Sequence, residues 1–92
     1  MSRVVVRRSH ALSPDEARER VAHLARRFGE RFGAECHWQG PVLVISHSNV
    51  TGTVTLEERD IVVDAELGFA LSLIRSRAEQ EIARILDEEL ST

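Results

Sequence analysis

The sequence contains no lysine, no tyrosine, a single cysteine and no long apolar run. The lone Cys36 cannot form an internal disulfide, which agrees with a reducing compartment. No stretch of about 18 apolar residues is present, so we expect no membrane span, and the charged N-terminus lacks the apolar core of a signal peptide. These absences predict a cytoplasmic protein. The replacement of lysine by arginine is explained most simply by codon bias.

Length and composition indicate a chain that folds by itself. The 92 residues are 42% apolar and 29% charged, which excludes a disordered chain. A chain of this length buries a core without disulfides or a metal. We therefore expect residues 1–92 to form a single domain.

The net charge of −3 hides a strong asymmetry along the chain. Residues 1–31 hold eight arginines and four acids, whereas residues 32–92 hold four arginines and eleven acids. Such a split is compatible with a binding face or with self-association into a homo-oligomer. The interpretation that we favour is that the two halves attract one another within the fold.

A helix is predicted from Pro14 to about Phe32. Ser13 and Glu16 form a capping box, and Pro14 occupies the first helical position, where its missing N–H is not needed. Gly33 is a typical helix stop. Apolar residues at spacings of three and four predict that one face of this helix is buried. They are Ala17, Val21, Leu24, Ala25, Phe28 and Phe32.

Five segments have the alternation or the β-branched content of strands. They are residues 3–8, 34–39, 42–46, 50–56 and 61–67. The last four are joined by short loops, and short loops can connect only antiparallel neighbours. These four strands are therefore predicted to form an antiparallel meander.

A second helix is predicted near the C-terminus, with a start anywhere from Ala70 to Ser76. Its apolar stripe is expected to comprise Leu71, Ile74, Ala78, Ile82 and Ile85. The element order is then β-α-β-β-β-β-α. Each helix has one apolar stripe, so the predicted fold class is α+β, an antiparallel sheet with both helices packed on one face.

The apolar stretch from Leu67 to Ile74 leaves two interpretations open. Its residues could close the core where the sheet passes into the second helix, which we favour because so small a domain has little apolar area to spare. They could instead face a partner or a lipid-like surface. The candidate partner-binding or ligand-binding residues are Trp38, Leu67, Gly68, Phe69, Leu71 and Leu73.

Arg20, Arg27 and Arg31 fall on one arc of the first helix and form a candidate basic patch. Glu16 and Glu30 share nearly the same arc and would cancel much of its field. A solvated helix face is therefore favoured over a nucleic-acid site.

No catalytic constellation or metal-binding motif is found. The four histidines do not occur at a recognised ligand spacing. Cys36 shares its strand face with Trp38 and not with a base, which favours a buried structural thiol over a nucleophile. We therefore expect no enzyme activity, no cofactor and no metal.

Four stretches together resemble the bacterial family of polyhydroxyalkanoic acid system proteins, also called the granule-region family. The resemblance covers nearly the whole chain, although the first helix of the family is usually richer in lysine. The stretches are Ala17-x-x-x-Val21 with Leu24-Ala25; Trp38-Gln39-Gly40 with Leu43-Val44; Val50-Thr51-Gly52-Thr53-Val54; and Leu67-Gly68-Phe69-x-Leu71 with Glu79-x-Glu81-Ile82 and Leu86.

The resemblance implies a cytoplasmic protein linked to polyester storage granules, without catalytic residues to carry over. Its role would be to bind the granule surface or a granule protein. The predicted shape is also similar to a small helix-grip domain, a fold that often encloses lipophilic ligands, so a module that binds a hydroxyacyl or lipid ligand is an alternative. An RNA-binding or ribosome-binding domain is a further alternative, against which the acidic C-terminal half argues.

Overall fold

Five strands and three helices follow one another in the order β-α-β-β-β-β-α-α in the computed structural model, which describes residues 2–91. The predicted order is confirmed, with one helix more than expected. The elements are β1 (Ser2–Ser9), α1 (Pro14–Phe32), β2 (Glu35–Gln39), β3 (Val42–Ser46), β4 (Val50–Leu56), β5 (Asp60–Leu67), α2 (Phe69–Ser72) and α3 (Arg75–Leu90).

The strands form one antiparallel sheet in the order β1-β5-β4-β3-β2. The meander predicted for β2 to β5 is confirmed. The N-terminal strand pairs with β5, so that Val4 lies opposite Ala65 and Val6 opposite Val63. This pairing makes β5 a central strand with neighbours on both sides, which agrees with its alternating burial.

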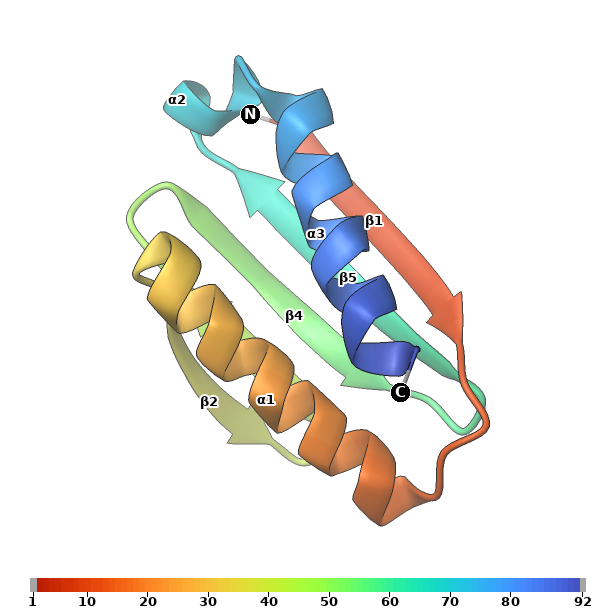
Figure 1. Cartoon of the computed structure of the whole chain (residues 1–92). Coiled ribbons are helices and arrows are strands. Elements are labelled where there is room, and N and C mark those ends of the chain that lie inside the picture. The colour runs from red at the N-terminus through yellow and green to blue at the C-terminus, as the bar shows by residue number, and fades with distance from the viewer. Residues whose placement is uncertain (1, 92) are drawn as a thin grey trace.

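Helices α1 and α3 lie on the same face of the sheet, as predicted, and they run in opposite directions (Figure 1). The core fills the layer between these helices and the strands. It includes Leu24 and Phe28 from α1, Ile85 and Leu86 from α3, and Val54 from β4. The opposite face of the sheet carries the side chains that alternate with the core residues.

The sequence signals at the ends of α1 are confirmed. The backbone N–H of Glu16 donates to the Ser13 hydroxyl at 3.2 Å, and the Ser13 N–H donates to the Glu16 carboxylate at 3.5 Å. Gly33 ends the helix at φ 71°, where a residue with a Cβ would be strained. The cap geometry fixes where α1 stops, and the position of its last turn matters for the site described below.

The C-terminal helix, α3, begins at Arg75, within the predicted range from Ala70 to Ser76, but the apolar stretch before it forms a separate single turn, α2. The Ser72 hydroxyl and N–H both donate to the Gly68 carbonyl, and the Ile74 N–H donates to the Leu71 carbonyl. The backbone of Ile74, at φ −121° and ψ 33°, is not helical. The predicted continuous stripe from Leu71 is therefore wrong at its start, and it holds from Ala78 onward.

Candidate functional site

The corner between β5 and α3 splits into a buried part and an exposed part. Leu67 is 1% exposed, and Leu71 is half-buried against the core. Phe69, Leu73 and Ile74 are 78%, 75% and 46% exposed. The core interpretation is therefore correct for Leu67 and wrong for Phe69, Leu73 and Ile74. We call these three exposed side chains the apolar corner.

The turn before β4 holds the start of this corner in place. The Gly68 N–H donates to the Asn49 carbonyl at 2.8 Å, which ties the end of β5 to the turn before β4. A single turn of helix then follows, and none of its residues is buried. The chain thus carries Phe69 beyond the edge of the core before it returns as α3.

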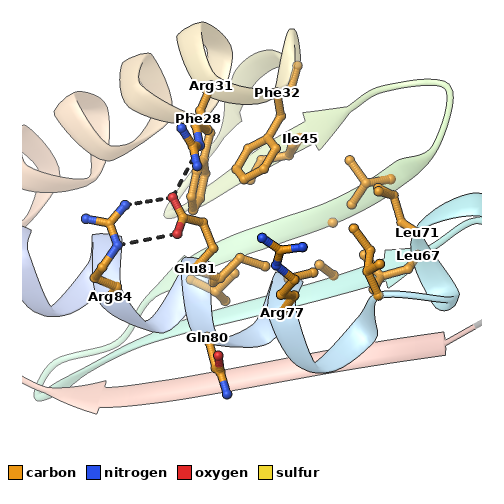
Figure 2. A pocket seen from close by; sticks show the side chains of 18 residues that line it. Phe28, Arg31, Phe32, Ile45, Leu67, Leu71, Arg77, Gln80, Glu81 and Arg84 are labelled. Atoms are coloured by element: carbon orange, nitrogen blue, oxygen red, sulfur yellow. Dashed lines mark hydrogen bonds and ion pairs between the residues drawn. The ribbon is translucent and has the colours of Figure 1, made fainter.

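A cavity of about 470 Å³ lies beside this corner, between α1, α3 and the sheet. It is partly open to solvent and mostly apolar. Its buried wall includes Phe28 from α1, Ile45 from β3, Val63 from β5 and Ile82 from α3. Figure 2 shows Phe28, Phe32, Ile45, Leu67 and Leu71 around this space. Of the sequence candidates, Leu67 and Leu71 line the cavity, whereas Phe69 and Leu73 do not.

Small residues on adjacent strands account for the floor of the cavity. Gly52 of β4 lies opposite Ala65 of β5, and both line the cavity. A Cβ at Gly52 would lie 2.5 Å from the Asp64 carbonyl oxygen, so the close approach of the two backbones requires glycine here. Gly52 belongs to one of the stretches that carry the family resemblance, but it was not among the predicted site residues. Its place on the core-facing side of a strand is the signal that could have identified it.

Three arginines and one carboxylate border the cavity where it meets solvent. Arg84 binds Glu81 at 2.6 Å, and Arg31 approaches the same carboxylate at 3.2 Å from α1. The hydrogen bond from Arg84 holds the pKa of Glu81 below its ordinary value. The negative charge of Glu81 is therefore already shared between two guanidinium groups.

Arg77 is the third arginine at the cavity. Within residues 2–91, no acid lies within ion-pair distance of its guanidinium and no hydrogen bond holds it. Figure 2 shows this side chain rising from α3 toward the space that Phe32 and Leu71 border. Arg84 is also paired with Glu88 at 2.6 Å, so the positive charge left without an acidic partner among the described residues at this border is that of Arg77.

The candidate basic patch lies along the contact between α1 and α3. Arg27 binds Glu88 at 2.6 Å and Glu89 at 3.0 Å, and hydrogen bonds to these acids raise the pKa of the Arg27 guanidinium. Arg20 donates to the Glu89 carbonyl at 3.1 Å, and Arg31 approaches Glu81. These pairs join basic residues of the first third to acids of the last helix. The interpretation that the two halves of the chain attract one another is confirmed, and the patch does not offer free cations to phosphate.

Trp38, a candidate from the sequence, lies away from both the apolar corner and the cavity. It sits near the end of β2, half-buried, with the guanidinium carbon of Arg18 4.0 Å from its ring centre. Cys36 on the same strand face is half-buried, and burial raises the pKa of its thiol. A raised pKa disfavours the thiolate that nucleophilic catalysis needs. Residues 2–91 contain no cluster of three metal-ligating side chains.

A family model described as "putative polyhydroxyalkanoic acid system protein" matches residues 4–90. The chain belongs to this family. The resemblance seen in the sequence is thereby confirmed, and the family name links the chain to the polyhydroxyalkanoate system. Searches of curated proteins and of solved structures each returned no match. Among the described residues, no helix has both the length and the apolar character needed to cross a membrane.

Proposed function

We propose that this polyhydroxyalkanoic acid system protein is a non-enzymatic protein that attaches to the surface of polyhydroxyalkanoate granules through its apolar corner. The observation that carries the proposal is the exposure of Phe69 and Leu73, each about three-quarters accessible. The family name links the chain to the polyhydroxyalkanoate system, so we expect the surface that it binds to be that of a polyhydroxyalkanoate granule. A polyester granule is an apolar body, and adjacent exposed apolar side chains are typical of surfaces that bind such a body.

The size of the corner sets the strength of the attachment. Full burial of one large apolar side chain stabilises by about 1.5–3 kcal/mol. Burying what is exposed of Phe69, Leu73 and Ile74 would therefore contribute about 3–6 kcal/mol. That corresponds to dissociation constants from the millimolar to the tens-of-micromolar range. The attachment is thus reversible, and many copies would exchange on one granule.

The test is cosedimentation with polyester particles prepared without any other protein. We expect the wild type to bind, and the double variant Phe69→Ser with Leu73→Ser to lose most of the bound fraction. The matched control is Val5→Ser, because Val5 is 51% exposed but lies on β1, away from the corner. Equal binding by the wild type and the double variant would overturn the role of the corner.

A granule protein is the competing target. If the wild type binds native granules but not bare polyester, the attachment to the polyester surface is wrong and a granule protein is the target. The double variant then decides whether the apolar corner contacts that protein. The RNA-binding alternative receives no support from the contacts of Arg27 and Arg31, which hold acids of α3.

A further inference from the structure

The apolar cavity and the arginine beside it point to a ligand that the granule attachment does not require. We propose that the cavity between α1, α3 and the sheet binds an amphiphile with an unbranched apolar chain and a terminal carboxylate, with Arg77 holding the carboxylate at the mouth.

The volume and lining fit the apolar chain. Small-molecule sites have volumes of roughly 300–1,000 Å³, and the cavity of about 470 Å³ lies within this range. Its wall is built from Phe28, Ile45, Val63 and Ile82, whose side chains give water no hydrogen-bond partner. Apolar cavities of this kind accept hydrocarbon more readily than water. Because Gly52 has no side chain, the apolar chain of the ligand can lie close to the strands at the floor of the cavity.

The charges at the mouth fit the carboxylate. The lining includes three arginines and a single carboxylate, Glu81, and Arg84 is paired in addition with Glu88, which leaves the positive charge of Arg77 at the border. Glu81 is engaged by Arg31 and Arg84, which lowers its repulsion of an anion. Arg77 lines the cavity, and no residue in the range 2–91 occupies its guanidinium, which is suited to a bidentate contact with a carboxylate. The same border would repel a cationic head group on an identical chain.

This site shares only Ile74 with the apolar corner. Phe69 and Leu73, the two most exposed residues of the corner, do not line the cavity, and Arg77 and Ala78 are not part of the corner. The inference therefore does not rest on granule attachment, and the two can fail independently. The double variant that removes the corner is expected to keep its affinity for the ligand.

The test is calorimetric titration of the folded full chain with three soluble probes below their micelle concentrations. The probes are decanoate, decyltrimethylammonium with the same chain and the opposite charge, and butyrate with the same head and a short chain. We expect saturable binding of decanoate, and at least tenfold weaker binding of the other two. Absence of saturable decanoate binding, or equal affinity for the cationic probe, would overturn the proposal.

Two variants locate the binding. Arg77→Gln is expected to weaken decanoate binding about three- to tenfold, whereas Arg59→Gln, an exposed arginine in the loop between β4 and β5, should leave it unchanged. Ala78→Leu adds carbon to the cavity wall and should weaken binding at least tenfold, since each displaced methylene costs on the order of fourfold. Ala83→Leu, on the same helix but outside the cavity, is its control.

Amide chemical shifts measured by NMR give a second readout of binding that does not rely on the heat measured by calorimetry. Decanoate should shift the amide signals of Gly52, Ala65 and Ala78, which line the cavity. If these signals stay in place and those of α2 move instead, the ligand binds the apolar corner and the cavity proposal is wrong. A fold check by circular dichroism ensures that a variant that loses binding is still native.

Discussion

The two ends of the α1–α3 pair differ sharply. Where the middle and second half of α1 meet the last turn of α3, Arg27, Glu88 and Glu89 hold the helices together. At the other end α1 stops at Phe32, and the first turns of α3 continue past it toward α2 without a helix opposite (Figure 1). The cavity lies at this second end. The comparison teaches that ion pairs between the helices occur at both places, since Arg31 pairs with Glu81 beside the cavity. What leaves the second end open is the small residues on the strands and the early stop of α1.

Glu89 and Gly52 mark the two ends most clearly. Glu89 is a charged residue with only 7% exposure, and it accepts hydrogen bonds from His23 at 2.7 Å and Arg27 at 3.0 Å. Gly52 has no side chain, and the β5 backbone lies where a Cβ would be. The packing at the first end therefore depends on a buried acid that accepts hydrogen bonds, whereas the close strand spacing at the second end depends on a residue without a side chain.

The largest effect is expected at the open end, from Gly52→Ala. The added Cβ would meet the Asp64 carbonyl oxygen at 2.5 Å, so β4 and β5 must move apart. Overpacking of this kind costs about 2–3 kcal/mol of unfolding free energy. Urea unfolding measures it, with Thr51→Ala on the exposed face of β4 as the control. A variant as stable as the wild type would show that the strands are not so closely spaced.

The next effect concerns the closed end, in the variant Glu89→Gln. The amide loses the charge that His23 and Arg27 contact, so we expect a loss of about 1–2 kcal/mol, since both partners are partly exposed to solvent. Asp87→Asn is the control, because Asp87 pairs with Arg8 at an exposed site and such pairs contribute little. If thermal unfolding shows the same loss of stability for Glu89→Gln and Asp87→Asn, the buried pairs of Glu89 stabilise the fold no more than an exposed ion pair does.

A smaller effect is expected from acid. Hydrogen bonds from arginines lower the pKa of Glu81 and Glu88 below the ordinary 4.5. A carboxylate whose folded pKa is lowered stabilises the fold above its unfolded pKa, and this contribution is lost as pH falls through the folded pKa. The midpoint of thermal unfolding should therefore decrease as pH falls below about 4.5. In Glu88→Gln the decrease should be shallower, and an unchanged slope would contradict the pairing.

Local signals predicted most of the fold. The capping box at Ser13, the stop at Gly33 and the alternation of β5 are properties of a few neighbouring residues, and each is confirmed. The charge split predicted the pairing of the two halves, because opposite charges on elements of one small domain meet readily. It did not identify the partners, which depend on how α1 and α3 are aligned.

The break between α2 and α3 could not be predicted from periodicity. The stretch from Leu67 to Ile74 is apolar throughout, so it fits a strand end, a loop or a helix equally well. The decisive contact is the bond from the Gly68 N–H to the Asn49 carbonyl, which joins residues distant in sequence. The cavity likewise depends on the register that sets Gly52 opposite Ala65. Tertiary pairing, and not local composition, decides both.

Two positions separate an open end from a filled one, and the substitution at Ala78 has the smallest expected effect. Ala78 is half-buried and lines the cavity, whereas Val21 on α1 is 1% exposed and belongs to the packed core. Ala78→Leu should place its new methyl groups in the cavity and raise the free energy of unfolding by about 0.5 kcal/mol. Val21→Leu enlarges a side chain within the packed core and should lower it by about 1–3 kcal/mol. Urea unfolding of the two variants compares added apolar volume at the two places. Equal destabilisation would mean that the cavity beside α3 is filled by its own side chains in solution, and a stable Ala78→Leu variant would show that the open end has room for a further apolar group.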